Sequence, residues 1–163
     1  MLDVLVDADL FRRLRIRGQA CGGPDGIPDL RQALRLVQGR PFTQLRPGGW
    51  AWLFGGDRLD QHLVCGIVDV AHLLVTHDLQ AGDTQSARLV AETAALAAPH
   101  EEIPTLDLAA VAAAEGHHEQ AARLLTDEVC NRTDDEDSVP GDLPGRTKDI
   151  LDRHHWVNKQ QAS

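Results

Sequence analysis

One group of polar residues has the types and the spacing to do chemistry. Asp69, His72 and Thr76 follow one another at intervals of three and four residues, which places them on one face of a helix. Aspartate and histidine side chains bind metal ions, and Asp107 and Glu115 are further candidate ligands along the chain. Spacing alone does not show that these residues converge. A helical metal-dependent hydrolase is therefore only a remote alternative, and we predict no catalytic residue, no metal ligand and no cofactor.

The other reactive residues match no catalytic motif. The sequence has no Gly-x-Ser-x-Gly elbow, and its glycine-rich stretch at 22–26 lacks the Lys-Ser/Thr of a phosphate-binding loop. The three cysteines, Cys21, Cys65 and Cys130, are odd in number and far apart, so they match neither a disulfide framework nor a zinc site. We interpret them as reduced thiols of a cytoplasmic protein.

The charge of the chain limits its partners. A net charge of −9 disfavours nonspecific attraction to nucleic acid or to an anionic membrane. Arg12, Arg13, Arg15 and Arg17 cluster near the start, and we interpret them as the solvated face of a helix. No apolar run approaches the ~20 residues that span a bilayer, and the first residues do not resemble a signal peptide. We expect a cytoplasmic location, no membrane contact and no direct nucleic-acid binding.

The apolar pattern predicts helical hairpins. Residues 57–99 contain a long helix, a Gly82-Asp83 turn and a second helix that ends at a proline. An earlier hairpin covers 7–38 and a later one 101–129. The separation of Gly82 from Gly116 equals the tetratricopeptide period of about 34 residues. We predict an all-α fold, a tetratricopeptide-like right-handed stack of about three helical hairpins plus a C-terminal helix.

Two parts of the chain do not follow the repeat pattern. We assign residues 7–130 to the repeat domain and residues 131–163 to an acidic flexible segment with a short C-terminal helix. The connector at 40–56 is rich in proline, glycine and aromatic residues. Its aromatic side chains either fill the gap between the first hairpin and the long helix or form an exposed patch that docks a partner. The candidate docking residues are Phe42, Trp50 and Trp52.

The polar face described first has a second interpretation in this fold. In the tetratricopeptide register it points into the concave groove of the stack, where mixed polar and apolar side chains bind peptides. The alternative is that residues 1–38 or the C-terminal helix fill the groove in cis. The candidate groove residues are Asp69, His72 and Thr76 and, one repeat later, Ile103, Leu106 and Ala110.

Several short sequences, in a fixed order, resemble a known family. They are Ala33-Leu34, Gly39-Arg40-Pro41-Phe42, Trp50 and Trp52, Arg58-Leu59, Leu79-Gln80-Ala81-Gly82-Asp83 with Ala87, Pro99-His100-Glu101-Glu102 with Leu106, and Gly116 with Ala121, Leu124 and Leu125. In this order they resemble the bacterial transcriptional activator domain of actinobacterial regulators, which also occurs in long LysM-containing proteins. The resemblance covers about residues 8–130.

The resemblance implies a function without catalysis. It implies a tetratricopeptide-like module for protein–protein interaction or self-association in a bacterial transcriptional regulator, with a protein partner or a second copy in a homodimer. The alternative is an adaptor domain of an envelope-linked LysM protein that has no regulatory role. The sequence contains no winged-helix or helix-turn-helix unit, so direct DNA binding is not implied, and we expect the segment to be one domain of a longer chain.

Overall fold

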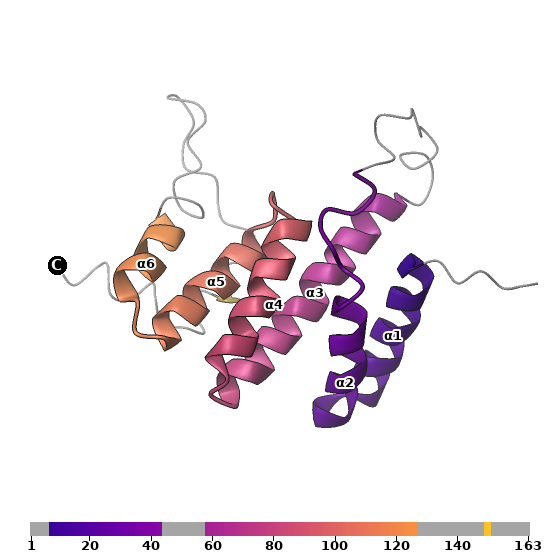
Figure 1. Cartoon of the computed structure of the whole chain (residues 1–163), viewed down its shortest axis with the longest axis horizontal. Helices are drawn as coiled ribbons and strands as arrows, with labels where there is room; N and C mark the ends of the chain where they lie inside the picture. Colours follow the sequence, from indigo (N-terminus) through magenta and orange to yellow (C-terminus); the bar gives the residue numbers. More distant parts are fainter. Residues whose placement is uncertain (1–6, 44–57, 127–148, 151–163) are drawn as a thin grey trace, which may run out of the picture.

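The computed structural model describes residues 7–43, 58–126 and 149–150, and these residues form an all-helical structure without strands. Figure 1 shows the helices arranged in a row from α1 to α6, and each helix packs against the next in sequence. The predicted all-α class is confirmed. The helices are α1 (Asp7–Cys21), α2 (Gly23–Leu34), α3 (Leu59–Gln80), α4 (Thr84–Ala97), α5 (Glu102–Ala114) and α6 (His118–Arg123).

The helices match the three predicted hairpins but differ at their ends. A single residue, Gly22, separates α1 from α2, because its left-handed φ of 66° reverses the chain at once. α2 ends at Leu34, short of the predicted stop at Gly39. α6 has six residues, and a wider helical turn follows it at 124–126. Most of the aromatic connector, the acidic stretch and most of the predicted C-terminal helix lie outside the described residues.

The turns after α3 and α5 have the same backbone geometry. Gly82 and Gly116 adopt left-handed φ angles of 76° and 86°. In each turn the glycine N–H donates to the carbonyl three residues earlier, at 3.1 Å. The N–H of the following residue donates to the carbonyl five residues earlier, at 2.9 Å after α3 and 2.8 Å after α5. This is the Schellman ending of a helix, and the chain forms it first at Gly82 and again at Gly116.

Small side chains are buried in both the second and the third hairpin. Ala87, Ala91 and Ala94 of α4 are fully buried, and so are Ala109 and Ala112 of α5. Because alanine has high helix propensity and little bulk, it supports the helices and lets their backbones approach closely. Larger apolar residues of α3 fill the centre of the core, including Ile67, Val70, Leu74 and Val75.

α3 departs from the expectation that no apolar segment approaches the ~20 residues that span a bilayer. Within the described part of the chain, α3 is long and apolar enough to cross a membrane by length and composition alone, with 22 residues and a mean hydropathy of 1.3 over its most apolar window. The buried share of that window is 44%, and the Asp69 and Asp78 side chains of α3 pair with arginines of α1 and α2. The buried apolar residues of α3, among them Ile67, Val70 and Leu74, lie in the core that the described helices share.

Candidate functional site

Polar side chains of α1 and α5, the first helices of the first and third hairpins, contact polar side chains of α3. Arg15 of α1 donates from Nη2 to Oδ2 of Asp69 at 3.1 Å. Nδ1 of His72 lies 2.7 Å from Oδ1 of Asp107 on α5, at hydrogen-bonding distance. The His72 and Asp107 side chains are 15% and 4% exposed, so neighbouring groups shield this pair from water. We call these four residues the polar row.

The polar row contains two of the three polar residues predicted for this face. Asp69 and His72 both have partners in it, and Thr76 lies half-buried on the same helix. Of the two further ligand candidates, Asp107 converges with His72, whereas Glu115 lies at the end of α5 and pairs with Arg88. Sequence reasoning missed Arg15. The sequence predicts a solvated side chain, but the Arg15 side chain is only 30% exposed because it reaches across to Asp69.

The apolar half of the predicted groove is covered. Ile103, Leu106 and Ala110 of α5 are buried, with 8%, 0% and 6% of their surface exposed. Ile103 and Leu106 belong to one apolar cluster with Ile150, which lies in the predicted acidic segment. Burying apolar surface is favourable at about 25 cal/mol per Å². The contact with Ile150 favours the alternative in which the chain's own residues fill the groove. The peptide-binding role of this face stays a prediction.

The aromatic candidates are described only in part. Phe42 is half-buried with a φ of 59°, a left-handed conformation that is rare for an aromatic residue. It lines a cleft of about 700 Å³ together with Phe11 and Leu63. Trp50 and Trp52 lie outside the described residues, so an aromatic docking patch also stays a prediction.

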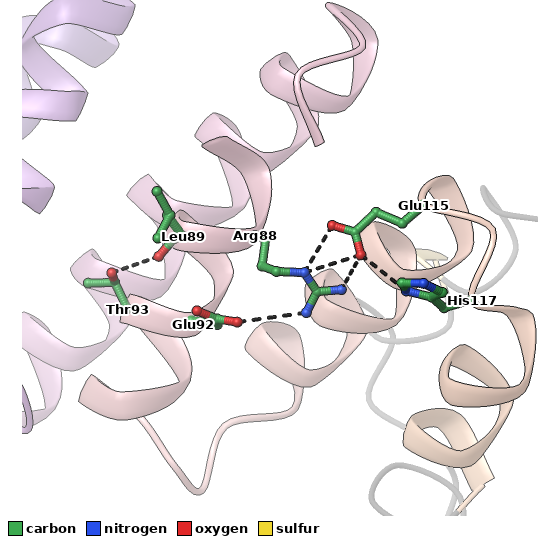
Figure 2. Close-up of polar contacts among 6 residues, drawn as sticks. All are labelled: Arg88, Leu89, Glu92, Thr93, Glu115 and His117. Atoms are coloured by element: carbon green, nitrogen blue, oxygen red, sulfur yellow. Dashed lines mark hydrogen bonds and ion pairs between the residues drawn. The ribbon is translucent and has the colours of Figure 1, made fainter. Parts of the chain in front are cut away.

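A second polar cluster joins α4 to the end of α5. Figure 2 shows the Arg88 side chain extending from α4 toward Glu115. Nε of Arg88 donates to both carboxylate oxygens of Glu115, at 2.9 and 3.2 Å, and Nη1 lies 3.7 Å from Glu92. The hydrogen bonds from Arg88 lower the pKa of Glu115, and the same bonds raise the pKa of Arg88. His117 Nδ1 lies 3.4 Å from the Glu115 carboxylate and adds to the lowering.

Two arginines link successive hairpins: Arg31 links α2 to α3, and Arg88 links α4 to the end of α5. Arg31 of α2 donates two N–H groups to Asp78 near the end of α3, one of them from Nη1 to Oδ2 at 3.2 Å. Arg88 of α4 also donates two N–H groups, from Nε and Nη2, to the Glu115 carboxylate at the end of α5. The partners are 47 and 27 residues apart, so no local sequence pattern predicted either pair.

No family model, curated protein or solved structure matches the chain. The resemblance to the bacterial transcriptional activator domain therefore stays a prediction.

The polar row is better suited to positioning helices than to holding a metal ion. Across 7–43, 58–126 and 149–150, no three His, Cys, Asp or Glu side chains form a group that could bind a metal. The His72–Asp107 contact instead links α3 to α5, and the Arg15–Asp69 contact links α3 to α1. The His72–Asp107 contact is largely buried and therefore costly to break, so it favours one arrangement of α3 and α5.

Proposed function

We propose that the chain is a non-enzymatic module for protein–protein interaction and self-association, built from tetratricopeptide-like hairpins, within a bacterial transcriptional regulator. The observation that carries this proposal is the Schellman turn at Gly82 and its repetition at Gly116, one tetratricopeptide period later in the sequence. Helical hairpins with this period form arrays that bind other chains on their extended surfaces.

Two further observations support a stacked array. The Arg31–Asp78 pair joins α2 to the C-terminal part of α3, and the Arg88–Glu115 pair joins α4 to the residue after α5, so an arginine of each second helix contacts the next hairpin. Each helix contacts mainly its neighbours in sequence, as in a linear repeat. The regulatory part of the proposal depends on the resemblance to the bacterial transcriptional activator domain, carried by Gly39-Arg40-Pro41-Phe42 and by the sequences that follow it.

The test measures association directly. Sedimentation of the full chain over a concentration series reports self-association, and crosslinking in a bacterial extract followed by mass spectrometry reports protein partners. We expect either a concentration-dependent dimer or a small set of reproducible crosslinked proteins that includes transcription components. A chain that remains monomeric and crosslinks to no protein above the level of an unrelated helical protein would show that the proposal is wrong.

A further inference from the structure

An open groove runs between α2 and α4, on the side of the stack formed by the second helices of the hairpins. Its volume is about 290 Å³, and its lining includes Leu34, Leu74 and Val90, which are almost fully buried. Leu89 of α4 stands at its edge with 61% of its surface exposed. Arg31 of α2 and Arg35, the residue directly after α2, also line the groove.

We propose that this groove binds an amphipathic helical segment of a partner protein, whose apolar side chain covers Leu89 and whose carboxylate pairs with Arg35. This inference rests on the proposed function, because it names the face of the module that is used and the chemistry of its partner. Helix-in-groove binding of this kind uses apolar anchors at helical spacing.

Leu89 is the apolar anchor point of the proposed site. Single exposed leucines are common on protein surfaces and need no explanation. Leu89, however, stands beside a hollow whose walls include Leu34 and Val90, which are 6% and 7% exposed. A partner side chain that covers Leu89 therefore lies against the edge of the apolar core. Covering Leu89 is favourable by about 25 cal/mol for each Å² of apolar area removed from water.

The two arginines beside the groove differ in their partners. Arg31 is engaged, because it donates two hydrogen bonds to the Asp78 carboxylate. Arg35 caps the end of α2, four residues after Arg31, is exposed, and forms no ion pair with another described residue. In a chain of net charge −9, the Arg35 side chain places one positive charge at the groove that Leu89 also lines. A partner carboxylate complements it, and a partner lysine or arginine does not.

The opposite side of the stack strengthens the choice of this groove. There, Arg15 covers Asp69 and the Ile150 side chain packs with Ile103 and Leu106. On the α2–α4 side, none of the described residues covers Leu89, which is 61% exposed. Within the described part of the chain, an incoming segment therefore reaches Leu89 without displacing another side chain.

The experiment uses the full chain and two labelled synthetic peptides of about 15 residues, long enough to form a helix on binding. Both carry leucines on one face, flanked by glutamates in the acidic peptide and by lysines in the basic one. Fluorescence anisotropy measures binding. We expect saturable binding of the acidic peptide with a Kd of about 10–100 µM, and binding of the basic peptide at least tenfold weaker.

Two variants and two matched controls locate the binding. Arg35→Glu should weaken binding of the acidic peptide at least tenfold and strengthen binding of the basic one, and Leu89→Glu should abolish binding of both. Arg13→Glu and Ile16→Glu place the same changes on exposed residues of α1, where Ile16 is 63% exposed, and should leave binding unchanged. Melting curves check that all four variants fold.

The outcomes separate this inference from the function on which it rests. No saturable binding of the acidic peptide, or equal loss in Arg13→Glu and Arg35→Glu, would overturn the groove assignment. If the chain self-associates or crosslinks to a partner and Arg35→Glu does not change that association, the groove assignment fails while the interaction function stands.

Discussion

Gly18 of α1 and Gly26 of α2 touch through their backbones. A Cβ atom built on Gly26 would lie 2.0 Å from the carbonyl oxygen of Gly18, and one built on Gly18 would lie 2.9 Å from the carbonyl oxygen of Gly26 and from Leu30. Both glycines are buried. Since no side chain fits between them, these two residues set the distance between the helices of the first hairpin.

Gly26→Ala should therefore force α1 and α2 apart. Overpacking against backbone costs more than overpacking against a flexible side chain, so we expect the free energy of unfolding to fall by about 2–4 kcal/mol. Urea denaturation followed by circular dichroism measures this change. Gln32→Ala, at an exposed position of the same helix, is the control, with an expected change within about 0.5 kcal/mol. Equal stabilities of the two variants would contradict the backbone contact.

The ion pair between Arg31 and Asp78 should matter far more than a surface pair. Asp78 is 1% exposed, so Arg31→Ala leaves a buried carboxylate without its guanidinium. We expect a loss of about 3 kcal/mol in the free energy of unfolding. The comparison is Arg17→Ala, which removes the partner of Asp29 at a site where the arginine is 64% exposed, and its effect should be much smaller. Thermal melts of both variants would rank them, and the reverse order would contradict the argument.

The repeated turn predicts equal responses at two distant positions. Gly82→Ala and Gly116→Ala each force a Cβ into a left-handed conformation, at a cost of about 1–2 kcal/mol. A Cβ atom at either position would meet no other atom within 4 Å, so the cost comes from the backbone alone. Asparagine tolerates this conformation better, so Gly82→Asn and Gly116→Asn should cost less. Unequal losses for the two alanine variants in urea titrations would show that the turns differ energetically.

Ala91 offers a test of the packing between the second hairpin and its neighbours. Its surface is 0% exposed, and Ala91→Leu adds three carbon atoms where there is no space. We expect a loss of about 1–3 kcal/mol. Gln85→Leu adds a leucine at an exposed position on the same helix and should leave the melting temperature nearly unchanged. An unchanged melting curve for Ala91→Leu would contradict the close helix contact.

The contact between Arg88 and Glu115 predicts a pH dependence. Hydrogen bonds from Arg88 lower the pKa of Glu115 in the folded chain, relative to about 4.3 for an ordinary glutamate. A lowered folded-state pKa stabilises the fold above the unfolded-state value, and this stability is lost as pH falls through the folded-state value. The wild-type chain should therefore exceed Glu115→Gln in stability at pH 6–7, and the difference should shrink below about pH 4.

Urea titrations of both chains at several pH values measure this difference. The control is Glu119→Gln, at an exposed position of α6, whose stability should parallel that of the wild type across the range. A difference between wild type and Glu115→Gln that grows toward low pH would have the wrong sign for a carboxylate stabilised in its charged form.

Local sequence was sufficient to predict most of the helices. Apolar residues at a 3.6-residue period marked α3, and Gly82 and Gly116 marked its turn and the equivalent turn one repeat later. These signals are local because helix hydrogen bonds and left-handed caps join residues only three to five apart. The same local signals overestimated the length of α6, where the regular helix ends at Arg123.

The tertiary structure alone decided which side chains meet. Arg15 belongs to a run of arginines that reads as solvated, and only the packing of α1 on α3 brings it to Asp69, 54 residues away. Asp107 and Glu115 are both acidic residues on or beside α5, yet one meets His72 and the other Arg88. Residue type and spacing determined that this chain forms paired helices. Long-range packing determined which faces of those helices are closed and which stay open, because that depends on distances that no local pattern encodes.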